Sequence, residues 1–272
     1  MIPYEKYHGT GNDFLIVDAR EHEVADRAAF AEAACDPDTV GADGVLFLSI
    51  EEGEPDRVVM RLFQPDGSTA AMCGNGARCA ARWAADRLGV SELVVDTPAG
   101  ARPTRIGPEA IEIDMGVPSF APESVPVDSP DPFEDRELGG YTVTAVNTGV
   151  PHAVAFVESV DAVDIEADAP PIRHADVFPE GANTNFAEPV DDGYRQRTFE
   201  RGVEGETRSC GTGAVAIAAV AHRKGETGVN ETVSVTPPGG ELGVRIDDEG
   251  RATLIGPVEF EFDGELPADL AP

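Results

Sequence analysis

The chain has 272 residues, 51 of them Asp or Glu and 20 Lys or Arg, which gives a formal net charge of −31. So acidic a surface repels phosphate backbones and anionic bilayers, which argues against nucleic-acid and membrane partners. The hydrophobic content of 41% is too high for a disordered chain, so the acidic residues must coat a globular body. Lys6 and Lys224 are the only lysines, and such a composition predicts adaptation to high intracellular salt, which screens surface repulsion.

The apolar segments and the N-terminal residues predict a cytoplasmic protein. No apolar run approaches the roughly 20 residues that a membrane span needs, and residues 1–6 lack the pattern of a signal peptide. The four cysteines are too few and too scattered for a disulfide scaffold. In a reducing compartment we expect them to be free thiols, metal ligands or catalytic groups: Cys35, Cys73, Cys79 and Cys210.

The predicted elements follow one order in both halves of the chain, with strands, a Cys-Gly-x-Gly turn, an Ala-rich helix and more strands. Both helices end with basic residues before a glycine, as helices commonly do. Residues 214–221 contain no polar side chain, so we expect strands to enclose that helix on nearly all sides. The strands are predicted at residues 14–18, 44–50, 58–63, 92–96, 111–115, 141–146, 153–157, 194–199, 232–236, 243–246 and 252–255, and the helices at 77–88 and 214–224.

An internal repeat accounts for this symmetry. The sequence CGNGA from Cys73 resembles CGTGA from Cys210, at an offset of 137 residues. Three further segments match in the same order at nearly the same offset, TGNDF with TGVPH, GAD with GAN, and RLFQ with RTFE. We therefore predict an α/β (α+β) fold of two pseudo-symmetric domains from a duplication, each a mixed β barrel wrapped around a central helix. The expected halves are residues 1–116 plus 257–272, with the C-terminal tail returning to the first half, and residues 117–256. The Pro-rich segment 117–132 is expected to connect them.

The chemistry should lie at Cys73 and Cys210, because each precedes Gly-x-Gly at the start of a helix. Glycines allow a positive φ and a close approach to a ligand. The unpaired N–H groups and partial positive charge of a helix N-terminus favour a thiolate and bind a carboxylate. A duplicated protein would face both turns across the cleft between its halves, with two thiols flanking one bound carboxylate.

Two acid/base groups on opposite faces of one carbon suit inversion of its configuration. One thiolate would remove the α-proton, and the other thiol would deliver a proton from the far side. A pyridoxal enzyme would need a Schiff-base lysine, and neither Lys6 nor Lys224 lies in a Gly-rich phosphate loop, so we expect no cofactor. A metal site of cysteines and a histidine is disfavoured by the poor C-x5-C ligand spacing. A dinucleotide site at Gly211 is disfavoured because no strand leads directly into that turn.

Three motifs together resemble the diaminopimelate epimerase family: HGTGNDF from His8, QPDGSTAAMCGNGAR from Gln64, and ERG from Glu200 followed by SCGTG from Ser209. The resemblance spans the chain from Tyr4 to about Gly264. It implies two pseudo-symmetric α/β domains and an isomerase that needs no pyridoxal phosphate. That isomerase would interconvert LL- and meso-diaminopimelate by a two-base mechanism, one step before lysine. A homodimer is common for this resemblance.

The family's site residues carry over by position. Cys73 and Cys210 would be the two bases, conventionally donor and acceptor in the LL-to-meso direction. His152 and Glu200 match residues thought to tune the thiols, and Arg201 is a natural partner for the distal carboxylate. No metal is implied. The substrate-binding residues would be Asn12, Gln64, Gly74, Asn75, Asn183, Glu200, Arg201, Gly211 and Thr212.

Three positions depart from the family pattern. Gln64 stands where Asn is common, which keeps the amide but adds a methylene. Val150 stands where Asn often precedes the Pro-His pair, so one hydrogen bond to substrate is in question. Gly44 stands where some members carry Gln, and could offer only a backbone contact.

Two rival functions remain open. A proline or hydroxyproline racemase of the same fold would tend to have His after the first Cys-Gly, where this chain has Asn75, and would lack the HGTGNDF-type start. A non-catalytic amino-acid-binding or thiol-redox protein would show no turnover that depends on Cys73 or Cys210.

Overall fold

The computed structural model describes residues 1–270 and divides the chain into two compact units. Unit 1 contains residues 1–113 together with the C-terminal segment from Gly256, and unit 2 contains residues 114–255. None of the helices within residues 1–270 has the length and hydropathy that a membrane crossing requires.

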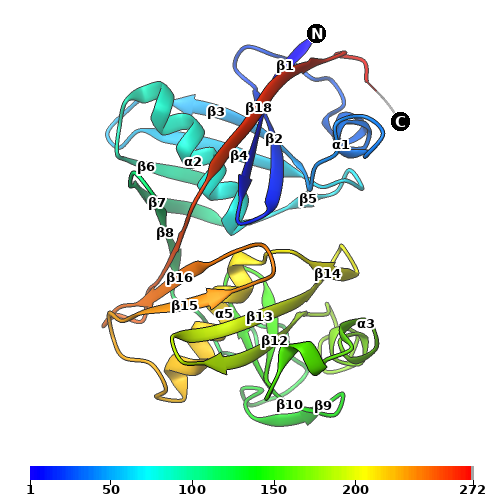
Figure 1. Cartoon of the computed structure of the whole chain (residues 1–272), viewed down its shortest axis with the longest axis vertical. Helices are drawn as coiled ribbons and strands as arrows, with labels where there is room; N and C mark the ends of the chain where they lie inside the picture. Colours follow the sequence, from blue (N-terminus) through cyan, green and yellow to red (C-terminus); the bar gives the residue numbers. More distant parts are fainter. Residues whose placement is uncertain (271–272) are drawn as a thin grey trace. The chain divides into compact units, whose positions relative to one another are not determined.

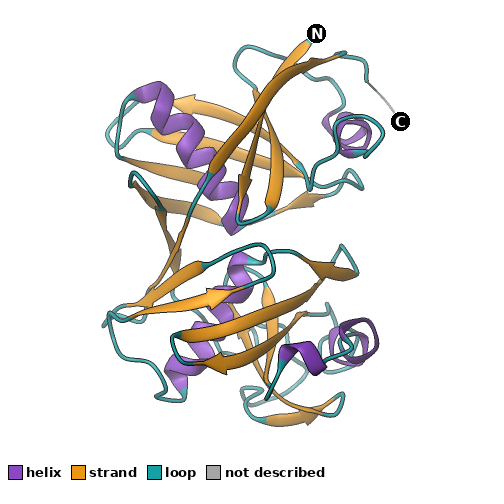
Figure 2. Cartoon of the chain, in the orientation of Figure 1, coloured by secondary structure: helices purple, strands orange, loops and turns teal. Residues whose placement is uncertain are grey.

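Unit 1 is a set of strands around one long helix (Figures 1 and 2). Neighbouring strands pair antiparallel except for β2 with β3 and β4 with β6, which are parallel. The C-terminal strand β18 runs beside β1, red against blue in Figure 1. The strands are β1 (Ile2–Gly9), β2 (Asn12–Asp18), β3 (Val45–Glu51), β4 (Arg57–Phe63), β5 (Thr69–Ala70), β6 (Glu92–Thr97), β7 (Gly100–Ile106), β8 (Ile111–Gly116) and β18 (Glu259–Leu266), and the helices are α1 (Arg27–Cys35) and α2 (Gly74–Leu88).

The helix α2 is the core of unit 1. It contacts β1, β2, β3, β4, β6 and β7, and small alanines on most sides let these strands approach it closely. Cys73 caps its N-terminus, and Gly89 ends it in the left-handed conformation (φ 69°) that glycine adopts most easily. On the outer side of the sheet, α1 packs its buried face, including Phe30, against Phe47 of β3. Strands of unit 1 therefore enclose α2 on several sides.

Unit 2 repeats this plan. Its central helix α5 contacts β10, β11, β12, β13, β15 and β16, and its pairings follow the order of unit 1, with parallel pairs β11 with β12 and β13 with β15. The short strand β9 pairs with β10 as β18 pairs with β1. The strands are β9 (Arg136–Leu138), β10 (Tyr141–Asn147), β11 (Pro151–Phe156), β12 (Asn183–Val190), β13 (Gly193–Glu200), β14 (Gly205–Thr207), β15 (Thr232–Thr236), β16 (Leu242–Ile246) and β17 (Ala252–Gly256), and the helices are η1 (Val160–Ala162), α3 (Ile165–Asp168), α4 (Pro170–Arg173) and α5 (Gly211–Arg223).

The matching order of pairings confirms the predicted duplicated α/β fold. The Pro-rich segment 117–132 is more than a connection, however, because Val125 and Val127 are buried in the core of unit 2 with Phe133. Part of this segment therefore belongs to the core of unit 2.

Candidate active site

Both predicted catalytic thiols stand at the N-cap of the central helix of their unit. Cys73 (φ −142°, ψ 115°) precedes α2, and Cys210 (φ −126°, ψ 101°) precedes α5. Neither helix has an acidic residue in its first turn. Each thiol thus lies where a helix offers N–H groups and partial positive charge. Gly74, Asn75, Gly211 and Thr212 form the first helical turns.

The glycines beside these thiols do not adopt the positive φ that the sequence analysis predicted. Gly74, Gly76, Gly211 and Gly213 are helical and none has a positive φ. A glycine is instead needed where neighbouring side chains pack closely against the helix. A Cβ on Gly213 would lie 2.4 Å from Asn185 Oδ1, whereas a Cβ on Gly76 would meet nothing closer than 3.4 Å. Absence of a side chain, rather than freedom of φ, is what the second turn requires.

Unit 1 brings Cys73, Asn75 and Asn12 together. The backbone N–H of Gly76 donates to Cys73 Sγ at 3.4 Å, and the same sulfur lies 3.9 Å from Asn12 Oδ1. Asn75 Nδ2 donates to Asn12 Oδ1 at 3.2 Å. Asn12, at the start of β2, is held in turn by donating from Nδ2 to Asp43 Oδ2 at 2.6 Å. The amide of Asn12 is therefore fixed beside the thiol from both of its ends.

A small charged cluster supports Asn12. Lys6 Nζ lies 2.6 Å from Asp13 Oδ2, and Asp43 accepts from the backbone N–H of Asp13 at 3.0 Å. Burial, and to a lesser degree the Asp13 carboxylate, raise the pKa of Asp43. Burial alone would lower the pKa of Lys6, but the hydrogen bond and charge of Asp13 raise it. Sequence reasoning missed Lys6 and Asp43 as supports, although Asp43 lies in one of the repeat matches.

Gln64 occupies a separate tight turn after β4. Its backbone N–H donates to Ser68 O at 2.8 Å, and Ser68 Oγ donates to Gln64 Oε1 at 3.2 Å. Within residues 1–270, its hydrogen bonds stay inside this turn. The oxygen of the longer side chain is thus engaged within its own turn.

Unit 2 places a buried polar network behind Cys210. The thiol lies 3.5 Å from Thr212 Oγ1, and the Cys210 carbonyl accepts from Gln196 Nε2 at 3.2 Å. Gln196 Nε2 also donates to Thr198 Oγ1 at 2.8 Å, and that hydroxyl donates to Asn185 Oδ1 at 2.9 Å. The chain of bonds runs from the helix start across β13 to β12. Gln196, Thr198 and Asn185 belong to no motif recognised in the sequence. The one signal was spacing: Gln196 and Thr198 are two residues apart on β13, so their side chains lie on the same face of the sheet.

The network ends at His152 on β11 and fixes its tautomer. Asn185 Nδ2 faces three acceptors, the carbonyls of Ala153 and Asn183 and the His152 Nδ1 atom at 3.0 Å, so this nitrogen is the donor. His152 Nδ1 therefore accepts and Nε2 carries the hydrogen. Burial, helped by the charge of Arg201, lowers the pKa of His152 to about 3, so the ring is neutral near pH 7. Its Nε2 has no hydrogen-bond partner within the described residues.

Glu200, Arg201 and Asn183 meet at the end of β13. Asn183 Oδ1 accepts the backbone N–H of Arg201 at 2.7 Å, and Glu200 Oε2 accepts from Thr207 Oγ1 at 2.9 Å. The Arg201 guanidinium donates to the carbonyl of Glu180 at 3.2 Å. Each of these side chains is thus oriented by a neighbour of its own unit, and unit 2 gathers every predicted site residue of its half around α5 and β11 to β13.

Comparison with known proteins decides the family. The sequence model of the diaminopimelate epimerase family matches residues 4–121 and 144–261. The chain belongs to the diaminopimelate epimerase family. A diaminopimelate epimerase of Methanothrix thermoacetophila is 45% identical over 266 residues, covering 94% of this chain and 93% of the relative. One of Methanocella arvoryzae is 42% identical over 280 residues, covering 99% and 98%.

A solved structure agrees with the fold. A predicted epimerase from Pseudomonas aeruginosa superposes with a TM-score of 0.72 at 17% identity, covering 98% of this chain and 99% of that one. The two proteins therefore share the duplicated architecture. By its family, this chain is an isomerase.

The other two cysteines, Cys35 and Cys79, do not stand at a helix N-cap. Cys35 and Cys79 are buried, and burial raises the pKa of each thiol to about 12. They are protonated at neutral pH and behave as small apolar side chains. Within residues 1–270, no group of three or more His, Cys, Asp and Glu side chains is arranged to hold a metal ion.

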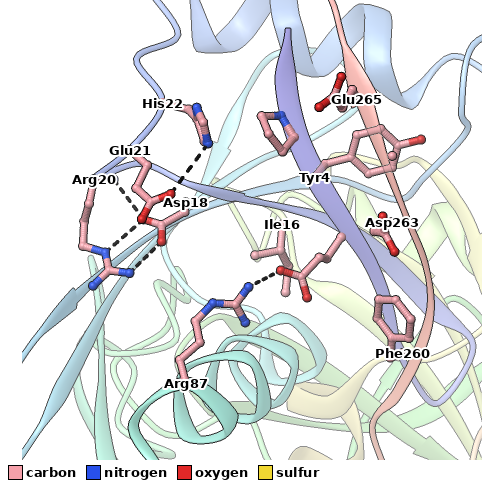
Figure 3. Close-up of a pocket in the computed structure, with 13 residues that line it drawn as sticks. Tyr4, Ile16, Asp18, Arg20, Glu21, His22, Arg87, Phe260, Asp263 and Glu265 are labelled. Atoms are coloured by element: carbon pink, nitrogen blue, oxygen red, sulfur yellow. Dashed lines mark hydrogen bonds and ion pairs between the residues drawn. The ribbon is translucent and has the colours of Figure 1, made fainter.

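A separate hollow of about 570 Å³ lies on unit 1, lined by residues of β1, β2 and β18 (Figure 3). The arginines that line it are already paired, Arg20 with Asp18 at 2.6 Å and Arg87 with Glu5. None of the predicted site residues lines it. This hollow is therefore not the candidate active site of the epimerase.

Proposed function

We propose that this enzyme interconverts LL- and meso-diaminopimelate without pyridoxal phosphate, using Cys73 and Cys210 as its two bases. The observation that carries the proposal is the equivalent position of the two thiols, each at the N-cap of the central helix of one repeat. The family membership and the names of the relatives support the substrate. The product would serve lysine biosynthesis.

The proposed reaction moves one proton off the α-carbon and another onto it. The thiolate of one cysteine removes the α-proton and becomes a thiol, while the thiol of the other cysteine protonates the opposite face and becomes a thiolate. The bound carboxylate takes up the developing enediolate-like charge, which the N–H groups of Gly74, Asn75, Gly211 and Thr212 would stabilise. Reversal of direction exchanges the two roles.

The remaining predicted residues would recognise the rest of the substrate. Arg201 would pair with the distal carboxylate, for which its charge and fork of N–H donors are suited. Asn12, Asn183 and Glu200 would bind polar groups of the amino acid. Gln64 would offer its amide nitrogen, since its oxygen accepts from Ser68. His152 and Glu200 would tune the thiols.

We further propose the setting in which the enzyme works. The two duplicated halves would be residues 1–116 plus 257–272 and residues 117–256. The net charge of −31 favours a cytoplasm of high salt and argues against nucleic-acid partners. A homodimer is the assembly we expect.

Deuterium exchange tests the function and its rival together. The enzyme is incubated in deuterated water, high salt and reducing agent, with LL-diaminopimelate in one arm and L-proline in the other. We expect deuterium at the α-carbon of diaminopimelate and none in proline. Deuterium in proline alone would overturn the substrate and favour the racemase alternative.

Cysteine variants test the two-base mechanism in the same assay. We expect Cys73→Ser and Cys210→Ser each to lose more than about 10³-fold of the epimerisation rate, because removing one acid/base group blocks the proton transfer. Cys79→Ser is the matched control on the same helix and should keep its rate. A Cys73→Ser protein with the rate of the unsubstituted enzyme would disprove the mechanism.

A further inference from the structure

Arg78 lies on α2, five residues after Cys73, and is fully buried with 0% exposure. Its Nη2 atom donates to Thr10 Oγ1 at 2.6 Å, and its Nη1 atom reaches the carbonyl of Gly74 at 3.5 Å. Its Nε atom has no hydrogen-bond partner within the described residues. The guanidinium thus sits between the first turn of α2 and the β1–β2 turn that carries Asn12.

No carboxylate of residues 1–270 forms an ion pair with Arg78. A buried cation without a counter-ion costs several kcal/mol, so such a residue requires a reason. Burial lowers the pKa of Arg78 to about 10, which still leaves it charged at neutral pH. The groups that favour its charge are the thiols of Cys79 and Cys73. Because Cys79 is protonated at neutral pH, the anion available to Arg78 is the thiolate of Cys73.

Three other charged groups of unit 1 are engaged with one another or with Asn12. Asp13 of β2 pairs with Lys6 of β1, and Asp43, which precedes β3, accepts from Asn12 and Asp13. The thiol of Cys35 on α1 is protonated, because burial raises its pKa to about 12. Lys6 is thus a second buried cation of unit 1, but it has a carboxylate partner in Asp13, whereas Arg78 pairs with no carboxylate within residues 1–270.

The second repeat shows that the fold does not need this arginine. The residue at the corresponding place is Val215, which is also fully buried. There Thr148, the counterpart of Thr10, donates directly from Oγ1 to the carbonyl of Thr212 at 2.9 Å. In unit 2 the turn is therefore joined to the helix by a hydrogen bond between neutral groups, with no arginine between them.

We infer that Arg78 is the buried counter-cation that favours the thiolate form of Cys73, and that it positions the turn carrying Asn12 beside that thiolate. Thr10 has a φ of 60°, a backbone conformation that a β-branched residue rarely adopts, and its hydrogen bond from Arg78 helps to hold it there. Arg78 acts through Cys73 and Asn12, so it is a positioning residue. The inference rests on the proposed role of Cys73 as a base.

The test measures the alkylation of Cys73 by iodoacetamide against pH in the full-length Cys210→Ser protein. Arg78→Gln keeps a donor for Thr10 but loses the charge, and Arg78→Lys keeps the charge but loses the fork. Thiolate is the reactive form, so we expect Arg78→Gln to slow alkylation at pH 7 by about tenfold and to move its midpoint upward by about one pH unit. Arg78→Lys should lie closer to the parent. Arg82→Gln is the matched control on α2 and should change nothing.

Epimerisation provides a second readout. If Arg78 acts on the charge of Cys73, the lost kcat/KM of Arg78→Gln should recover as the pH is raised, and Arg78→Lys should retain more of it at pH 7. A folded Arg78→Gln protein with the parent's alkylation profile would overturn the inference. Because alkylation needs no turnover, this result stays separate from a failure of the proposed substrate, which would appear as absent epimerisation in the parent enzyme itself.

Discussion

The two repeats carry the same thiol on the same scaffold but surround it with different chemistry. Behind Cys73, unit 1 has a buried cation, Arg78, and packs the Phe14 ring beside Gly76. In the repeat alignment Phe14 corresponds to His152, which in unit 2 is neutral and held by Asn185. Duplication has kept the backbone and the helix N-cap at which each thiol lies. It has changed the groups that set the charge.

This contrast suggests two ways to manage a thiol that alternates between two protonation states. Unit 1 opposes the negative charge with a full positive charge, which acts at a distance. Unit 2 has a network of neutral hydrogen-bond donors behind Cys210, and a neutral donor affects only the groups within hydrogen-bond distance. Substitutions in one unit that leave the other unit unchanged can therefore separate the effect of a charge from the effect of side-chain placement.

Among changes that leave both thiols in place, the largest expected effect comes from filling the space behind Cys210. In Gly213→Ala the new Cβ would lie 2.4 Å from Asn185 Oδ1 and 2.7 Å from Gln196 Nε2, so the network must shift. We expect a loss of about 1–3 kcal/mol in the free energy of unfolding and about 10²-fold in kcat, because the thiol moves. Urea unfolding and epimerisation rates would measure both.

The counterpart in unit 1 is the control for this change. In Gly76→Ala the nearest atom to the new Cβ is 3.4 Å away, which is ordinary contact. We expect much smaller losses there. Equal effects at both positions would show that the tight packing behind Cys210 is not what distinguishes the repeats.

The next expected effect comes from giving unit 2 the residue of unit 1, as His152→Phe. The Nε2–H has no partner within the described residues, so we expect it to donate to the reacting groups, and losing that hydrogen bond of about 1.4 kcal/mol should lower kcat about tenfold. The variant should also change the acid stability of the protein. The folded pKa of His152 is about 3 against 6.5 for a free histidine, so the unfolded chain binds the extra proton as the pH falls below 6.5.

The parent enzyme should therefore lose stability through this group between about pH 6.5 and 3, by about 1.4 kcal/mol per pH unit. His152→Phe removes that contribution, so its free energy of unfolding should depend less steeply on pH over the same window. Urea midpoints measured from pH 7 to pH 4 would show it. Identical pH slopes in the two proteins would mean that His152 is charged or exposed in the folded state.

Sequence reasoning reached the duplication and both N-cap thiols because the CGNGA and CGTGA segments carry them locally. It expected positive φ at the glycines beside them, but helical φ values and tight packing are found, since a steric requirement made by β12 and β13 cannot be seen in a turn motif. The Asn185, Thr198 and Gln196 network escaped notice because its members come from different strands. Arg78 lies within a motif that the sequence analysis recognised. That it is buried with no carboxylate partner could not be predicted, because this depends on which strands pack around α2.

The smallest expected effect concerns the thiols that the repeats do not share. Cys79 is fully buried on α2, and burial raises its pKa to about 12, so it is neither nucleophilic nor charged at pH 7. Cys79→Ala should keep kcat within about twofold and cost about 1 kcal/mol in the free energy of unfolding, from the small cavity it leaves. In the native protein iodoacetamide should modify Cys79 only after urea unfolding. If Cys79→Ala instead lowered kcat as strongly as Cys73→Ser, the position at a helix N-cap would not be what distinguishes Cys73 and Cys210 from the other two cysteines.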